Sequence, residues 1–187
     1  MREYVFGYGS LVVGVPGGFV AELPGMRRGW GVAMDNRADV PGYKCYLDGD
    51  GHRPAVSVCF LDIEPDPSPG ARVNGVCVPV GAEELVALDR RERNYDRIDV
   101  SDRFEELGRA RVWTYRGSVA GRARLAAAVR AGTAVIHAGY LAAVEAGFRA
   151  LGEDQWTACA PSLQPGGLRV LELVRRELPP PRQSPPD

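Results

Sequence analysis

Lysine is almost missing from this chain of 187 residues, since Lys44 is the single lysine among its 23 basic residues. The 24 acidic residues leave a formal net charge of −1. Proteins dedicated to nucleic-acid binding usually carry a basic excess, and a polybasic membrane anchor needs clustered positive charge. We therefore expect neither a nucleic-acid partner nor a membrane partner.

Long apolar runs are also missing, so the sequence predicts no membrane-spanning helix. The first residues, Met1–Phe6, lead directly into a strand-like segment and contain no hydrophobic stretch of the kind found in signal peptides. Together these two absences predict a cytoplasmic protein.

Residues that bind metals are few and scattered. None of the four cysteines belongs to a C-x-x-C pair, and the two histidines, His52 and His137, lie far apart. Paired cysteines and histidines at short spacing are the usual sign of a zinc site. We expect reduced, structural cysteines at Cys45, Cys59, Cys77 and Cys159.

A chain of this length can bury about 70% of its unfolded surface, which is enough for one domain without staples. Short segments rich in valine and aromatic residues predict strands at 3–6, 19–23, 29–34, 44–47, 56–63, 73–80, 98–100 and 110–115. Helical spacing predicts helices over 82–93, 122–131 and 136–151, whereas 168–176 fits a strand or a helix. Strands first and helices late favour an α+β fold, barrel-like with helices packed outside.

A glycine-rich turn, Gly7-Tyr8-Gly9-Ser10-Leu11, follows the first predicted strand. Its glycines would let backbone N–H groups converge on an anion or a carbonyl oxygen. A dinucleotide-binding G-x-G-x-x-G and a nucleophile elbow G-x-S-x-G would both require glycine at position 12, which is Val12. The alternative is a tight turn without function.

Glu92 is the more informative residue, because Leu85, Leu88 and Glu92 share one face of the predicted helix. The apolar stripe of that helix therefore ends in a carboxylate. Desolvation and the negative end of the helix dipole both disfavour its anion, as suits a group that exchanges protons. Alternatively, Glu92 pairs with an arginine such as Arg93 or Arg97, or the helix ends before it.

Other polar and aromatic residues have simpler explanations. His137, Tyr140 and Phe148 fall on the apolar stripe of the helix predicted over 136–151, and we interpret them as core residues.

Three segments in order resemble the γ-glutamylcyclotransferase superfamily. They are Val5–Leu11, similar to its F-G-Y-G-S-L opening; Phe19–Trp30, similar to a following strand pair; and Leu88–Val100, similar to L-D-x-x-E-x-x-Y-x-R-x-x-V. A later segment, Gly139–Gly147, resembles its C-terminal helix.

The resemblance implies a small mixed or antiparallel β-barrel with flanking helices. It also implies an enzyme that releases 5-oxoproline from a γ-glutamyl amide or peptide, without metal or cofactor. By position, Glu92 matches the catalytic glutamate, and the substrate-binding residues would be Tyr8, Gly9, Ser10, Leu11, Tyr95 and Tyr115.

The partner implied is thus a small γ-glutamyl molecule, whose leaving amine the sequence leaves open. A module that binds such a molecule without catalysis is the alternative function. A homodimer is compatible with the sequence, which does not fix the oligomeric state.

The resemblance covers about residues 2–152, so we expect a γ-glutamylcyclotransferase-like domain over 1–152. Residues 153–178 would form a C-terminal extension packed on this domain, with no assigned role. Five prolines within 179–187 predict a disordered tail.

Overall fold

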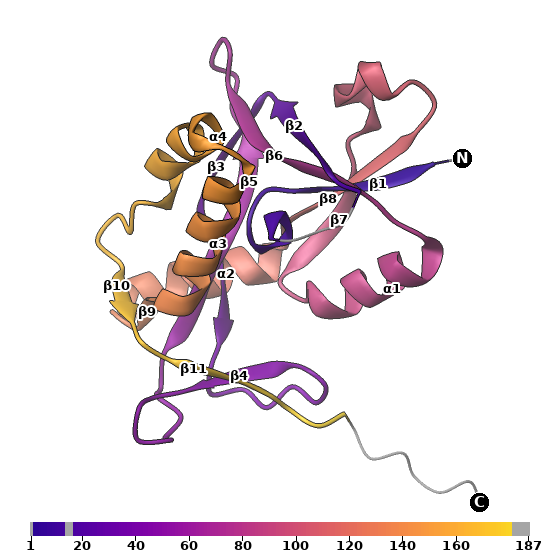
Figure 1. Cartoon of the computed structure of the whole chain (residues 1–187). Coiled ribbons are helices and arrows are strands. Elements are labelled where there is room, and N and C mark those ends of the chain that lie inside the picture. Colours follow the sequence, from indigo (N-terminus) through magenta and orange to yellow (C-terminus); the bar gives the residue numbers. More distant parts are fainter. Residues whose placement is uncertain (1, 14–16, 181–187) are drawn as a thin grey trace, which may run out of the picture.

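The computed structural model describes residues 2–13 and 17–180 of the chain, and its strands form three sheets (Figure 1). The first has the order β2 (Phe19–Pro24), β6 (Arg72–Pro79), β1 (Glu3–Gly7), β8 (Arg111–Gly117) and β7 (Tyr95–Asp99). The second has the order β10 (Arg169–Leu171), β9 (Ala134–His137), β5 (Ser57–Pro65) and β3 (Met26–Asp35). The third pairs β11 (Val174–Glu177) with β4 (Lys44–Leu47).

The α-helices of the described residues are α1 (Ala82–Arg91), α2 (Val119–Arg130), α3 (Ala138–Leu151) and α4 (Glu153–Cys159). Short 3-10 turns lie at η1 (Ser10–Val12), η2 (Ser101–Arg103), η3 (Glu105–Leu107) and η4 (Ala160–Leu163). In the described part of the chain, no helix combines the length and the apolar character needed to cross a membrane.

The predicted α+β class is confirmed, but the predicted barrel is not closed in the described residues. Side chains join the first two sheets where β5 approaches β8. The Gly117 amide of β8 donates a hydrogen bond to the Asp62 carboxylate of β5 over 2.6 Å, instead of joining a backbone ladder between the sheets. A further bridge runs from the Tyr95 hydroxyl to the Leu61 carbonyl over 2.6 Å. Side-chain bridges of this kind hold the sheets together without completing a barrel.

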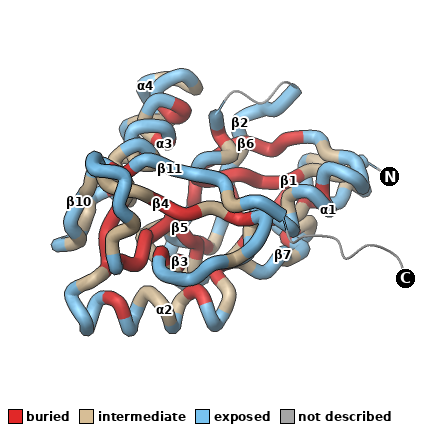
Figure 2. Tube along the Cα trace, turned by 90° about the horizontal axis from the view of Figure 1, so that it is seen from below, coloured by how far each residue is buried: buried red, intermediate tan, exposed pale blue. Residues whose placement is uncertain are grey.

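The central strands carry most of the core. Figure 2 shows β1 and β5 largely in the colour of buried residues, whereas β11 is exposed along its length. Phe6 of β1 packs in one cluster with Leu61 of β5 and with Phe148 of α3, and all three are almost fully buried. Burying such a side chain contributes roughly 1.5–3 kcal/mol, so this cluster fixes β1 against α3.

All three predicted helices begin or end elsewhere, and two of the differences concern the site. The segment over 136–151 is divided, because Ala134–His137 forms the strand β9 and α3 begins at Ala138. Ile136 belongs to β9, which lies between β5 and β10. Its apolar side chain therefore suits a strand that is buried on both sides. Periodicity alone cannot separate such a buried strand from the start of a helix. The helix predicted over 82–93 ends at Arg91.

Other boundaries shift by up to three residues. The helix predicted over 122–131 is α2 and begins at Val119, with the Ser118 hydroxyl accepting a hydrogen bond from the Gly121 amide at 3.1 Å. The strand predicted at 98–100 is part of β7. The ambiguous segment over 168–176 contains the two short strands β10 and β11.

Residues 153–178 contact the rest of the molecule at several points. The Trp30 indole N–H donates to the Gln164 carbonyl at 3.0 Å, and Arg28 Nε donates to Ser162 Oγ at 2.8 Å. Of the predicted disordered tail, Pro179 accepts a hydrogen bond from the Gly42 amide at 2.9 Å. The rest of that prediction, residues 181–187, lies outside the described residues. All four cysteines are free and buried.

Candidate functional site

The glycine-rich turn lies where β1 ends and η1 begins, and its glycines allow close contacts. A Cβ added to Gly7 would lie 2.5 Å from Leu11 Cβ, and one added to Gly9 would lie 3.1 Å from the Tyr140 hydroxyl. Arg28 Nη1 holds the Tyr8 carbonyl at 3.0 Å. The turn is therefore packed against Leu11, Tyr140 and Arg28, and a side chain at Gly7 or Gly9 would crowd these neighbours.

Glu92 follows the last residue of α1 and turns away from the helix. Its amide still donates to the Leu88 carbonyl at 2.8 Å, and its own carbonyl accepts from the Tyr95 amide at 2.9 Å. The helix thus ends before Glu92, as one of the sequence alternatives had it. The side chain is 18% exposed, so the chain reversal directs a largely buried carboxylate toward the start of β7.

An arginine holds this carboxylate, but it is neither Arg93 nor Arg97. Nε and Nη2 of Arg91 both lie 2.8 Å from Glu92 Oε1. Arg97 instead lies 3.6 Å from Asp89. Among the described residues no hydrogen bond to the other oxygen, Glu92 Oε2, is found, so this oxygen is available to a ligand.

Glu92 lines a cavity with two adjoining parts, an inner part of about 40 Å³ and an outer part of about 330 Å³. Four residues line both parts: Ser10, Glu92, Tyr95 and Tyr140. The inner part brings together every site residue that the sequence predicted, namely Tyr8, Gly9, Ser10, Leu11, Glu92, Tyr95 and Tyr115. The turn after β1 and the carboxylate after α1 therefore face one another across a single cavity.

Three of the four tyrosines that line the inner part, Tyr8, Tyr95 and Tyr115, donate their hydroxyl protons to protein acceptors. The Tyr8 hydroxyl donates to the Tyr115 carbonyl at 2.5 Å, and the Tyr95 hydroxyl donates to the Leu61 carbonyl at 2.6 Å. The Tyr115 hydroxyl donates to Asp89 Oδ1 at 2.8 Å. Burial raises the pKa of all three phenols, and Asp89 raises that of Tyr115 further. Their oxygens can therefore only accept from a ligand, as suits an amine or amide N–H.

A family model described as "Gamma-glutamyl cyclotransferase, AIG2-like" matches residues 5–144. The chain belongs to this family. The predicted superfamily is thus confirmed. A solved structure titled "Gamma-glutamyl cyclotransferase" is similar, with 17% sequence identity over 86% of this chain and 88% of that chain and a TM-score of 0.47. No curated protein sequence matches the chain.

The outer part of the cavity contains residues that the sequence did not point to, and one of them lies beyond the match to the cyclotransferase family. They include Lys44 of β4, His137 at the end of β9 and Arg175 of β11. Tyr140, interpreted from the sequence as core, packs in the core and also lines both parts of the cavity. The scarcity of lysine was the one signal that could have drawn attention to Lys44.

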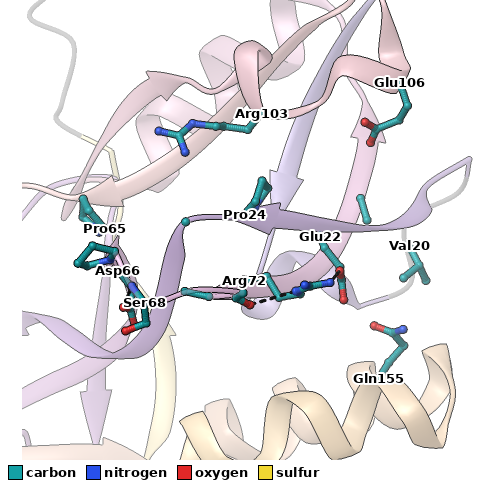
Figure 3. A pocket seen from close by; sticks show the side chains of 15 residues that line it. Val20, Glu22, Pro24, Pro65, Asp66, Ser68, Arg72, Arg103, Glu106 and Gln155 are labelled. Carbon is teal, nitrogen blue, oxygen red and sulfur yellow. Dashed lines mark hydrogen bonds and ion pairs between the residues drawn. The ribbon is translucent and has the colours of Figure 1, made fainter.

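A second concave region of this γ-glutamyl cyclotransferase family member is larger, at about 1230 Å³, but more open (Figure 3). It lies between β2, β6 and the loop after β5, and its main polar feature is an ion pair between Glu22 and Arg72 at 3.1 Å. None of the residues predicted for the site lines it. Both members of the ion pair are about half exposed. The smaller cavity at Glu92 is therefore the candidate active site.

Proposed function

We propose that the chain is a γ-glutamylcyclotransferase that releases 5-oxoproline and a free amine from a γ-glutamyl amide or peptide. The observation that carries this proposal is the convergence of Glu92 and the glycine-rich turn on one cavity in a chain of this family. The α-amine nitrogen attacks the γ-carbonyl carbon and closes a five-membered ring. The bond from that carbon to the leaving nitrogen breaks, and this nitrogen takes up a proton.

The cavity has to hold the substrate folded, because a reaction within one molecule gains much of its rate from orientation. The phenol oxygens of Tyr8 and Tyr95 would accept hydrogen bonds from the α-amine. Glu92 Oε2 would take the amine proton and then give it to the leaving nitrogen, so that one carboxylate acts as base and acid in turn. The bond from Arg91 to Oε1 orients the carboxylate for both steps.

The glycine-rich turn would supply the anion-binding part of the site. No hydrogen bond from the Ser10 or Leu11 amide to another described residue is found, and both residues line the inner part of the cavity. Backbone N–H groups in this position would stabilise negatively charged oxygen, either on the tetrahedral intermediate or on the α-carboxylate.

The alternative function is binding without catalysis. It is favoured by the ion pair between Arg91 and Glu92, because a carboxylate held in an ion pair is also a common structural element. The two functions are separated by incubating the protein with a γ-glutamyl peptide, a γ-glutamyl amino acid and a γ-glutamylamine, and measuring 5-oxoproline. We expect 5-oxoproline and the free amine in equal amounts from at least one class. Compounds that raise the melting temperature but release no 5-oxoproline would establish the binding module.

Substitutions in the turn should separate backbone geometry from side-chain chemistry. In Gly9→Ala, the new Cβ would lie 3.1 Å from the Tyr140 hydroxyl, so this hydroxyl or the turn has to move by a few tenths of an ångström. A shift near 1 Å can cost on the order of 10²-fold in rate, and for this smaller shift we expect a kcat/KM loss of roughly tenfold. Ser10→Ala is the matched control, and it should retain most of the activity. If Ser10→Ala alone abolished turnover, or an acyl group were trapped on Ser10, a nucleophilic mechanism would replace the one proposed.

A further inference from the structure

Lys44 is a cation that forms no ion pair with any described residue. It is partly buried, and its Nζ lies 4.5 Å from the centre of the Phe60 ring and 5.2 Å from that of Tyr43. Among the described residues no carboxylate lies within ion-pair distance of it. Lysine side chains that leave bulk water are usually paired, so this ammonium group suits a ligand that brings its own negative charge.

The other basic residues of the outer part are already engaged. Arg91 binds Glu92, and Arg175 binds Glu177. His137 has a buried Nδ1 with no hydrogen-bond partner among the described residues, and its ring packs 5.0 Å from that of Tyr46. Lys44 and His137 thus both have unused hydrogen-bonding capacity in the lining of the outer part.

The pairing of β4 with β11 explains why Lys44 faces the cavity. Lys44 lies opposite Glu177 and Tyr46 lies opposite Arg175 in this antiparallel pair. Directly opposed residues share a face, and side chains alternate along a strand, so these four lie on one face of the small sheet. The opposed pairs on its other face are Cys45 with Arg176 and Leu47 with Val174.

The outer part begins where the inner part ends, at Glu92, Tyr95 and Tyr140. The inner part, at about 40 Å³, is too small for a whole γ-glutamyl group, so in the proposed reaction this group lies at Glu92 across both parts and the leaving amine extends into the outer part. Its volume of about 330 Å³ is at the small end of ligand cavities.

We propose that Lys44 binds a carboxylate on the leaving group, with His137 beside it, so that the preferred substrates are γ-glutamyl amino acids or peptides rather than γ-glutamyl alkylamines. This inference rests on the proposed function and names its substrate class. β11 lies beyond the family match. It contributes Arg175 to the lining of the outer part and pairs with β4.

Two compounds that differ by one carboxylate test the assignment. γ-Glutamylalanine releases alanine, whereas γ-glutamylethylamide releases ethylamine, which is alanine without its carboxyl group. We expect kcat/KM to be at least tenfold higher for γ-glutamylalanine. Lys44→Met should remove this preference by lowering only the alanine value, and Lys44→Arg should restore part of it. Arg176→Met is the matched control, since it removes a cation from the other face of the same sheet.

The outcomes are distinct. Equal activity on both compounds, or an equal loss on both in Lys44→Met, would overturn the inference, and the equal loss would place Lys44 against the γ-glutamyl part. If neither compound nor a γ-glutamyl peptide gave 5-oxoproline, the proposed function would fail. Calorimetric titration of the same compounds would then decide the subsite, because Lys44 should still favour the alanine compound by a similar factor. A melting temperature close to that of the parent chain verifies that each variant is folded.

The preference should also depend on pH. The charged and titratable side chains around Lys44 are Arg91, Glu92, His137, Arg175, Glu177, Tyr43 and Tyr46. Burial is the main cause that lowers the pKa of Lys44 from 10.5 to about 8, with Arg175 adding to it and Glu92 opposing it. The ammonium form is lost as the pH rises through this value, so the ratio of the two kcat/KM values should fall around pH 8. A ratio that stays constant from pH 7 to pH 9 would contradict the assignment.

Discussion

Glu92→Gln is expected to lower kcat by roughly 10²–10⁴-fold, the usual effect of removing a general base, and by more if the same group also returns the proton. Glutamine keeps the shape of the side chain but cannot accept a proton at this position. The substrate should still bind, since the turn and the tyrosines are untouched. Steady-state assays of 5-oxoproline, with calorimetry on the variant, measure both effects.

The fold should tolerate this change. Arg91 is nearly half exposed, so losing its ion pair with Glu92 should cost less than about 1 kcal/mol. Glu83→Gln provides the matched control, because Glu83 is an exposed glutamate at the other end of the same helix. Near-normal turnover in Glu92→Gln would exclude the proposed role. Unfolding of that variant would instead assign Glu92 a structural role.

Asp62→Ala should cause the largest loss of stability, roughly 3 kcal/mol or more. The Asp62 side chain is 1% exposed and lies 2.8 Å from Arg122 Nη2. It also accepts hydrogen bonds from the Ile63 amide at 2.7 Å and the Gly117 amide at 2.6 Å. Alanine would remove the buried carboxylate that Arg122 pairs with, leaving Arg122 only the Ile63 carbonyl at 3.2 Å and Glu64 at 3.6 Å, and would leave the Ile63 and Gly117 amides without this acceptor at the contact between β5 and β8. Urea unfolding, followed through its midpoint and slope, measures the loss.

Glu22→Gln is the control for this substitution. It removes a carboxylate from the ion pair with Arg72, but that pair is exposed on the open groove of Figure 3. Exposed pairs of this kind contribute up to about 1 kcal/mol, so the midpoint should hardly move. Equal effects of the two substitutions would show that burial of Asp62 does not determine its contribution.

Local sequence patterns predicted the inner part of the candidate site. The turn after β1 depends on consecutive residues, and Glu92 depends on the spacing of one helix, so both could be located before any tertiary structure was known. The predicted interpretation of Glu92 as part of the apolar stripe was wrong in detail, because α1 ends at Arg91 and the chain reversal, not the stripe, buries the carboxylate. The partner Arg91 was missed because the turn brings adjacent side chains together.

The outer part of the site could not be predicted, because it depends on pairing between distant segments. From the sequence alone, Lys44 is an ordinary strand residue, because its place in the cavity depends on the pairing of β11 with β4. From the sequence alone, His137 is a helix residue, because nothing local shows that β9 forms between β5 and β10. The sequence predicted a barrel, but the described sheets do not close into one. β5 and β8 are joined through the Asp62 side chain, and no strand pattern reveals such a contact.

The position of β1 between β6 and β8 sets the order in which the chain can fold. The Tyr8 hydroxyl reaches its acceptor in Tyr115 across 107 positions of sequence. Contacts at such separation form late, because the intervening loop has to close first, and proteins rich in them fold slowly. During synthesis, the glycine-rich turn emerges before β8 and can acquire its partner Tyr115 only after β8 has emerged. The outer part of the cavity can form only after β11, which contributes Arg175. A nascent chain therefore lacks the complete candidate site until β11 has left the ribosome.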